Sequence, residues 1–253
     1  MGPVSRMVGP DVAPPQPWQF PLPDPPTKLA DMDKVAADLD KLMKEKDLSD
    51  FVRLAMNSAG TYRHTDHLGG CNGARIRFSP GKDWKTNAGL DKTLASLEPI
   101  KSSYGDSLPW ADLIVLAGNV AVKRLGAPVD LPFCAGRTDA LDGAGWEPLG
   151  EYGNADPPKT IEEVADRNAL RGMTEKEFVA LCFPVYPSVA ALSDLLESAK
   201  SDDEDITAQA LIYHPDFKNW VDYYLSAGDD KYAHDFGCAW TNLMNADRFD
   251  GPV

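Results

Sequence analysis

Apolar residues recur at helical spacing over most of the chain beyond residue 30. In LADMDKVAADLDKLMKEK, one helix face collects four of them, at positions i, i+4, i+7 and i+8: Val35, Leu39, Leu42 and Met43. A second helix is expected to begin near Ser49, a residue type that favours the N-cap, and to cover residues 51–59. Similar patterns predict helices over residues 88–104, 109–125, 160–170, 174–183, 188–200, 215–226 and 230–245. Strand-like alternation is scarce, so the sequence predicts a mainly α protein without internal repeats.

The first 28 residues do not share this helical pattern. The segment PPQPWQFPLPDPPTK is rich in proline, which lacks the N–H that a helix interior needs, so an extended chain with polyproline stretches is expected. Trp18, Phe20 and Leu22 alternate along it, which indicates an arm that packs on a surface, either of this chain or of a partner. We therefore expect an extended docking arm over residues 1–28 and a single helical domain over residues 29–253.

Charge narrows the classes of partner. The chain carries 39 acidic and 25 basic residues, a formal net charge of −14 at pH 7. Binding to a nucleic-acid backbone needs clustered Lys and Arg, so this balance argues against it. No apolar run approaches the roughly 20 residues of a membrane-spanning helix, and MGPVSRMVGP lacks the apolar core of a signal peptide. We predict protein partners, with neither nucleic-acid binding nor a membrane span.

Cysteine and histidine spacing gives no strong metal signal. The four cysteines lie far apart and form no CxxC pair, which excludes a zinc ribbon: Cys71, Cys134, Cys182 and Cys238. We expect them to be small buried hydrophobic residues, with disulfides left open. His64 and His67 could hold a metal only with further ligands from elsewhere, so a surface loop is favoured. For His214 and His234 we expect surface or capping roles. The sequence contains no P-loop, nucleophile elbow or zincin helix.

Several segments, taken in order, resemble the class I haem peroxidases. They are FVRLAMNSAGTYR, GGCNGARIRFSPGKDW, NAGLDKTLASLEPIKSSYG, WADLIVLAGNVAVKRLGAP, PFCAGRTDA, LRGMTEKEFVAL and WTNLMNADRFD. The likeness is greatest to the catalase-peroxidases, which are built of two related halves. GGCNGARIRFSPGKDW and NADRFD are more similar to the C-terminal half, which binds no haem in that family. MGPVSRMVGPDV resembles the segment that joins the two halves. This resemblance implies that the chain could be cut from a longer precursor. The resemblance implies an all-α haem-peroxidase fold of about ten helices.

The resemblance also implies a distal motif, Arg-x-x-Trp-His, on one helix. There the histidine takes a proton from bound peroxide, and the arginine stabilises the departing hydroxide. Arg53 matches the arginine, while Met56 stands at the tryptophan position and Asn57 at the histidine position. Asn87 matches the asparagine that orients the histidine. An amide does not take up a proton near neutral pH, and loss of a general base costs roughly 10²–10⁴ in rate. For Arg53 we favour a structural role in which its guanidinium pairs with a carboxylate.

The proximal side departs further from the family pattern. Aligning MTEKEFVALCFPVYPS on the proximal helix places Tyr186 where a histidine ligates iron. A phenolate can ligate haem iron, yet Pro184 and Pro187 flank Tyr186 and disfavour the helix that would aim its ring. Residues 187–206 are short and acidic, and they contain no counterpart of the family's proximal tryptophan and aspartate.

Three hypotheses follow. The favoured one is a degenerate peroxidase without haem or another metal, acting as a structural or docking subunit of a larger assembly. Haem-free relatives at photosynthetic membranes suggest, by analogy only, a plastid or thylakoid setting and a membrane-associated complex as partner. The second is a haem b peroxidase that acts on hydrogen peroxide in the oxidative-stress response, with Tyr186 as axial ligand. The third is a module that binds another small molecule in the emptied haem cavity.

Overall fold

The computed structural model describes residues 22–146, 149–150, 154–182, 188–200 and 205–247. These residues contain ten α-helices and no strand; only an isolated bridge joins Gly73 to Asp139. The helices are α1 (Met32–Leu42), α2 (Leu48–Ala59), α3 (Leu90–Tyr104), α4 (Trp110–Arg124), α6 (Ile161–Arg171), α7 (Glu175–Leu181), α8 (Val189–Ala199), α9 (Ile206–Tyr213), α10 (Pro215–Ala227) and α11 (Asp229–Met244). Short 3₁₀ turns occupy Glu45–Asp47, Arg75–Arg77, Gly81–Asp83, Lys85–Asn87 and Gly105–Ser107. The predicted mainly α fold of about ten helices is confirmed.

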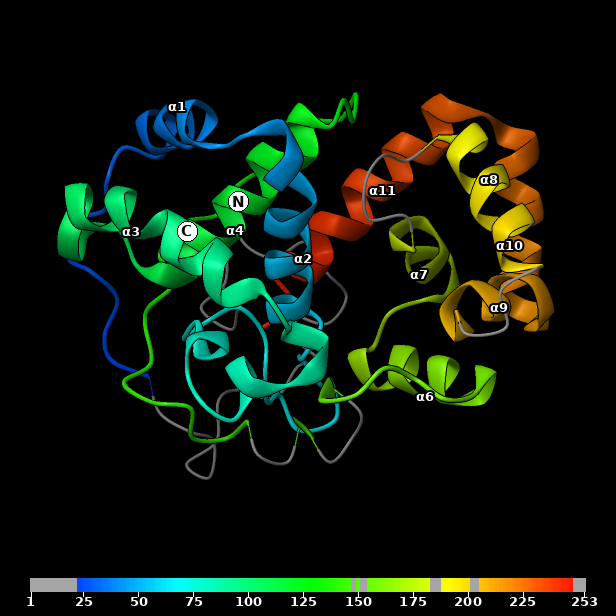
Figure 1. Cartoon of the computed structure of the whole chain (residues 1–253), viewed down its shortest axis with the longest axis horizontal. Coiled ribbons are helices and arrows are strands. Elements are labelled where there is room, and N and C mark those ends of the chain that lie inside the picture. Colours follow the sequence, from blue (N-terminus) through cyan, green and yellow to red (C-terminus); the bar gives the residue numbers. More distant parts are fainter. Residues whose placement is uncertain (1–21, 147–148, 151–153, 183–187, 201–204, 248–253) are drawn as a thin grey trace, which may run out of the picture.

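Helix α4 is the buried centre of one part of the molecule. Twelve of its fifteen residues are buried, so its sequence is apolar on nearly every face. Figure 1 shows α1, α2 and α3 grouped around it, while α6 to α10 lie together on the other side of the view. Helix α11 runs between the two groups (Figure 1) and packs against α7, α10 and α2. No helix in the described part of the chain is long and apolar enough to cross a membrane.

The close approach of α2 and α4 depends on Gly118. A Cβ added there would lie 2.5 Å from the Cβ of Ala55 on α2 and 3.1 Å from Cζ2 of Trp240 on α11. The indole Nε1 of Trp240 also donates to Oδ1 of Asn119, at 2.7 Å. The absence of a side chain at position 118 therefore lets two helices pack closely on α4.

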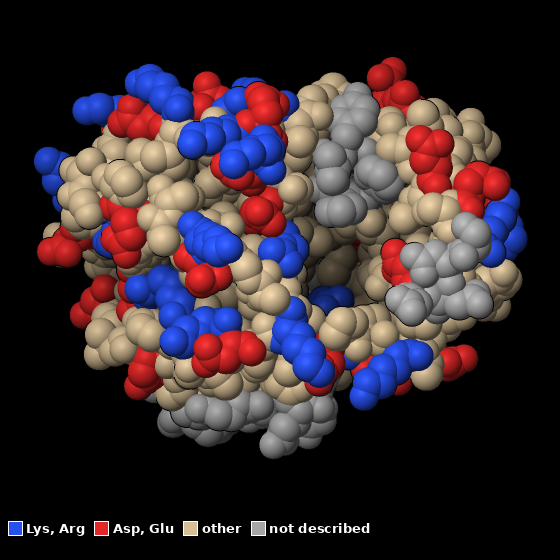
Figure 2. Space-filling model, viewed as in Figure 1, with Lys and Arg blue, Asp and Glu red and all other residues tan. Residues whose placement is uncertain are grey.

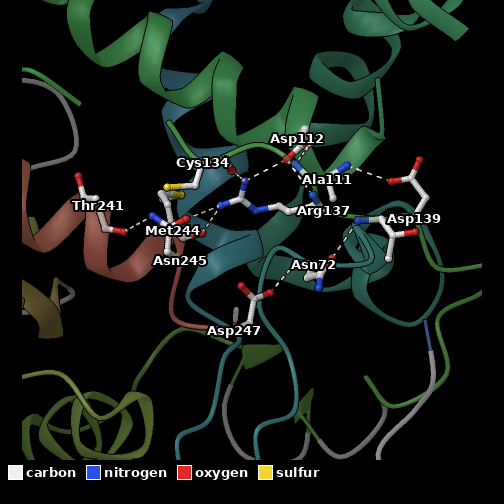
Figure 3. A network of polar contacts seen from close by, with 12 residues as sticks. Asn72, Ala111, Asp112, Cys134, Arg137, Asp139, Thr241, Met244, Asn245 and Asp247 are labelled. Atoms are coloured by element: carbon white, nitrogen blue, oxygen red, sulfur yellow. Dashed lines mark hydrogen bonds and ion pairs between the residues drawn. The ribbon is translucent and has the colours of Figure 1, made fainter. Parts of the chain in front are cut away.

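A buried polar network joins α4 to the end of α11 (Figure 3). Arg137 and Asp112 form an ion pair at 3.0 Å, and neither side chain is exposed to solvent. Asp112 also accepts from the backbone N–H of Gly136 at 2.8 Å. Arg137 donates to the Met244 carbonyl at 2.7 Å and to Oδ1 of Asn245 at 3.0 Å. Since each ion is paired and hydrogen-bonded, the network can be buried without leaving an uncompensated charge.

Two local expectations were wrong. Ser49 does not cap α2, because a 3₁₀ turn leads directly into the helix and Asp47 occupies the N-cap position, without a side-chain bond. Helix α9 was not expected, because its sequence ITAQALIY has no polar face; residues 208–211 are buried in succession. Such a segment cannot be assigned from helical periodicity.

The proline-rich arm falls mostly outside the described residues, and Trp18 and Phe20 lie there. At its end, Leu22 lies beside Gly73, and the Asp24 carbonyl accepts from the hydroxyl of Thr138 at 3.4 Å. This part of the arm therefore runs along the surface of the same chain. A docking role for the arm stays a prediction.

The four cysteines are free thiols, so the disulfides left open by the sequence are not formed. Cys71 and Cys134 are buried, as expected, and Cys182 is partly buried. Cys238 is exposed on α11, which contradicts the expectation of burial. Its sulfur lies 3.8 Å from Nε2 of His234, one helical turn away.

Thr174→Ala should lower the free energy of unfolding by about 1 kcal/mol, because Thr174 is the N-cap of α7. Its hydroxyl accepts from the N–H of Glu177 at 3.2 Å, and the Glu177 carboxylate accepts from the N–H of Thr174 at 2.9 Å. Urea unfolding followed by circular dichroism measures the loss. Thr174→Ser keeps the hydroxyl and is the control; an equal loss in both variants would contradict the capping role.

Candidate ligand cavity

A cavity of about 450 Å³ opens between α2 on one side and α6 and α7 on the other. Figure 2 shows the hollow near the middle of this face, with basic side chains at its floor and beside its mouth. Its lining includes the apolar residues Met56, Pro158, Val164, Met173, Phe178, Leu181 and Leu243. Three arginines share this lining: Arg53, Arg167 and Arg171. A cavity of this size and composition falls within the range of small-molecule sites.

Helix α2 presents Arg53, Met56 and Asn57 to the cavity, since a spacing of three or four residues keeps them on one face. Asn87 ends the neighbouring 3₁₀ turn and meets Asn57 directly. The Asn57 Nδ2 group donates to Oδ1 of Asn87 and to the Thr86 carbonyl, both at 2.9 Å. The structure thus brings together the distal residues that the sequence singled out.

The orientation of both amides is set by backbone carbonyls. Nδ2 of Asn87 donates to the Gly81 carbonyl at 2.7 Å, so its Oδ1 must face Asn57. Asn57 then has two acceptors before it, the Thr86 carbonyl and the Asn87 oxygen, and must offer its NH₂ group to them. Asn57 therefore donates to Asn87 as a distal histidine is expected to do. Unlike a histidine, it has no basic nitrogen that could take up a proton.

Arg53 is held at the edge of the cavity. Its Nη2 lies 3.3 Å from Oδ1 of Asp50 and donates to the Ala88 carbonyl at 3.0 Å. The side chain keeps 40% of its full exposure. The guanidinium pairs with a carboxylate, the structural role that the sequence favoured.

The opposite wall carries two arginines that the sequence analysis did not single out. Arg167 and Arg171 lie one turn apart near the end of α6, and their i, i+4 spacing in ADRNALRG was the available signal. Arg167 pairs with Glu163 and donates to the Asp156 carbonyl at 2.9 Å. Arg171 donates through Nε to the Gly60 carbonyl at 2.7 Å. Burial and, second, the nearby charge of Arg167 lower the pKa of the Arg171 guanidinium to about 10.

The histidines lie away from the cavity lining. No group of three His, Cys, Asp or Glu residues that could hold a metal ion occurs among the described residues. Nδ1 of His67 lies 2.9 Å from the Tyr62 hydroxyl, and the His64 ring meets the His67 ring edge-on. His214 occupies the cap position between α9 and α10, and its ring packs on Phe217 with centroids 4.4 Å apart.

The family relationship rests on comparison with known sequences. A profile of the family described as Peroxidase matches residues 32–183, more than half of the chain. The chain belongs to the peroxidase family. The class I haem peroxidase relationship expected from the motifs is thereby confirmed, and α2, α6 and most of the cavity lining fall within the matched region.

Several relatives of this chain are catalase-peroxidases. The protein from Mycobacterium ulcerans (strain Agy99) is 32% identical over 318 residues, covering 99% of this chain and 43% of the relative. That from Agrobacterium fabrum (strain C58) is 34% identical over 315 residues, covering 99% and 42%. That from Pseudomonas entomophila (strain L48) is 41% identical over 145 residues, covering 55% and 20%. The chain spans less than half the length of these relatives.

The described residues that line the cavity offer no histidine or tyrosine as an axial ligand for haem iron. Cys182 lines it, but burial, with the charge of Asp205 as second cause, raises the pKa of its thiol and disfavours the thiolate that binds iron. Tyr186, Pro184 and Pro187 lie outside the described residues.

Proposed function

We propose that this chain is a degenerate peroxidase that binds no haem and serves as a structural or docking subunit of a larger protein assembly. The observation that supports this most directly is the Asn57 amide at the position of the distal base. Its NH₂ group is bound to Thr86 and Asn87, and an amide offers no basic nitrogen to peroxide. Loss of a positioned base lowers the rate roughly 10²–10⁴-fold, which would leave too little peroxidase activity to be useful.

The contacts of Arg53 and the net charge of the chain support the same proposal. The Arg53 guanidinium is bound to Asp50 and to the Ala88 carbonyl, which stabilises the start of α3 whether or not chemistry occurs. The net charge of −14 suits association with a basic surface of other protein subunits. A plastid or thylakoid location remains an analogy.

The size of the cavity favours one alternative. A cavity of about 450 Å³ lies between α2 on one side and α6 and α7 on the other, beside the distal-motif residues Arg53, Met56 and Asn57. In this alternative, haem b occupies it with Tyr186 as axial ligand, and the protein acts on hydrogen peroxide as its catalase-peroxidase relatives do by name.

A visible absorption spectrum of protein purified from its native source separates the two. We expect no Soret band, no haem by pyridine haemochrome, and no band after addition of hemin. A stoichiometric Soret band that is lost in Tyr186→Phe would overturn the proposal and establish the alternative. Cross-linking in native extract tests the docking role, which a chain that runs only as a free monomer would contradict.

A further inference from the structure

The cavity has a local charge opposite to that of the whole chain. Its described lining holds three arginines, and the only carboxylate among those residues is Asp50, which is paired with Arg53. In a protein of net charge −14, such a concentration of guanidinium groups around one hollow is not an average property of the surface. Figure 2 shows a basic side chain at the floor of the hollow and both basic and acidic side chains around its mouth.

Arg171 is the group whose charge is not balanced. Its single hydrogen bond within the described residues is from Nε to the Gly60 carbonyl. No described carboxylate forms an ion pair with it, and the charged group with the largest effect on its pKa is a second guanidinium, that of Arg167. Arg171 is half-buried, and partial loss of water around a guanidinium without a counter-charge is costly, so an anion in the cavity would offset that cost.

The geometry of Arg171 also selects the kind of anion. Nε is engaged by Gly60 and Arg171 lines the cavity, so its two Nη groups remain available to a ligand there. Two neighbouring N–H donors match the two oxygens of a carboxylate, the bidentate arrangement that arginine favours. Arg167, which pairs with Glu163, lies one helical turn away, and its buried Nε has no hydrogen-bond partner among the described residues.

The rest of the cavity favours an apolar body. Val164, Met173, Phe178 and Leu243 supply a wall that water solvates poorly. A fully hydrated inorganic anion would leave this surface wet, whereas a ring or a short alkyl chain would cover it.

We propose that the cavity binds a small monocarboxylate with an apolar ring or chain, whose carboxylate pairs with the Nη groups of Arg171. The inference rests on the proposed function in one respect, because a haem would fill the same space. The ligand would stabilise the contact between α2 and α6, since Gly60 of α2's C-cap and Arg171 already join them.

Two matched fluorescent probes test this on the full chain. 8-Anilinonaphthalene-1-sulfonate is an aromatic anion, and N-phenyl-1-naphthylamine has the same rings without the sulfonate. We expect the anion to bind the wild type and Arg171→Gln to weaken it roughly tenfold to a hundredfold, with the neutral probe changed by less than about twofold. Octanoate should displace the anionic probe at concentrations where octanol and inorganic phosphate do not.

Two further variants control for folding and for overall charge. Thr207→Phe fills the cavity from α9 without touching Arg171, and it should weaken both probes. Lys92→Gln removes a charge from an exposed position of α3 and should change neither. Thermal unfolding of each variant shows whether it is folded, and Thr207→Phe still tests the site if Arg171→Gln does not fold.

Each outcome has one meaning. Anionic-probe binding that is unchanged in both Arg171→Gln and Thr207→Phe overturns the proposed site. If phosphate displaces the anionic probe as strongly as octanoate does, the proposal that the ligand has an apolar ring or chain is overturned. Haem-free protein that binds neither probe ends this inference and leaves the proposed function intact. A stoichiometric Soret band in the same preparation overturns the proposed function instead.

Discussion

Replacing Arg137 with methionine should lower the free energy of unfolding by about 3–5 kcal/mol. The change leaves the Asp112 carboxylate buried without its counter-ion, and neither side chain of the pair is exposed in the wild type. It also removes the donors to the Met244 carbonyl and to Asn245, so acceptors at the end of α11 lose their partners (Figure 3). Urea unfolding at pH 7, followed by far-ultraviolet circular dichroism, measures the loss.

Two variants isolate the charge effect. Lys41→Met removes an ion pair with Asp38 in which the lysine side chain is 74% exposed, and it should cost no more than about 1 kcal/mol. Asp112→Asn combined with Arg137→Met removes both charges and should be less destabilised than the sum of its parts. An Arg137→Met protein within about 1 kcal/mol of wild type would contradict a structural role for the buried pair.

This network also bears on the cavity. Leu243, in the cavity wall, directly precedes Met244, whose carbonyl Arg137 holds. Loss of Arg137 therefore removes a hydrogen bond next to this wall but no group that lines the cavity. Ligand binding to Arg137→Met should be weakened only as far as its folded fraction falls, because Arg137 is not part of the described lining.

Most helices could be predicted because their apolar residues repeat at helical spacing. The structure begins α3 and α4 within two residues of the expected positions. Helix α9 could not be found this way, since a helix buried on several sides has no polar face to give it a period. Ser49 was misassigned because the cap preference of serine is local, whereas the preceding 3₁₀ turn at Glu45–Asp47 sets where α2 starts.

The two walls of the cavity differ in how much the sequence reveals. On α2, family motifs are enough to place Arg53, Asn57 and Asn87 together. On α6, the i, i+4 spacing of Arg167 and Arg171 is the available local signal, and it does not distinguish Arg171 from a surface arginine. Arg171 differs from a surface arginine in two ways. Its Nε donates to the carbonyl of Gly60, which lies 111 residues earlier in the chain, and no carboxylate among the described residues balances its charge. Both are properties of the packed molecule, and no periodicity or motif encodes them.

Gly118→Val should lower the free energy of unfolding by about 3 kcal/mol, at the upper end of overpacking effects. A Cβ at position 118 would come within 2.5 Å of the Ala55 Cβ, an atom fixed to the α2 backbone that cannot rotate away. Trp240 blocks the other direction at 3.1 Å. Thus WADLIVLAGNVA, part of one of the segments that resemble the family, contains a packing requirement at its glycine. Urea unfolding measures the loss, and Lys123→Val, at an exposed position of α4, should change stability by less than about 0.5 kcal/mol.

The same substitution tests how α2 is positioned. If the side chain introduced by Gly118→Val pushes α2 away from α4, then Asn57 and Met56 move with the helix, and binding of the anionic probe should weaken in protein that is still folded. Exchanging the two small residues, Ala55→Gly with Gly118→Ala, removes the clash between the helices while keeping their combined volume. This double variant should be more stable than Gly118→Ala alone, because the 2.5 Å contact no longer exists. Equal stability of the two would mean that the helices adjust without cost, and that the glycine does not set the distance between α2 and α4.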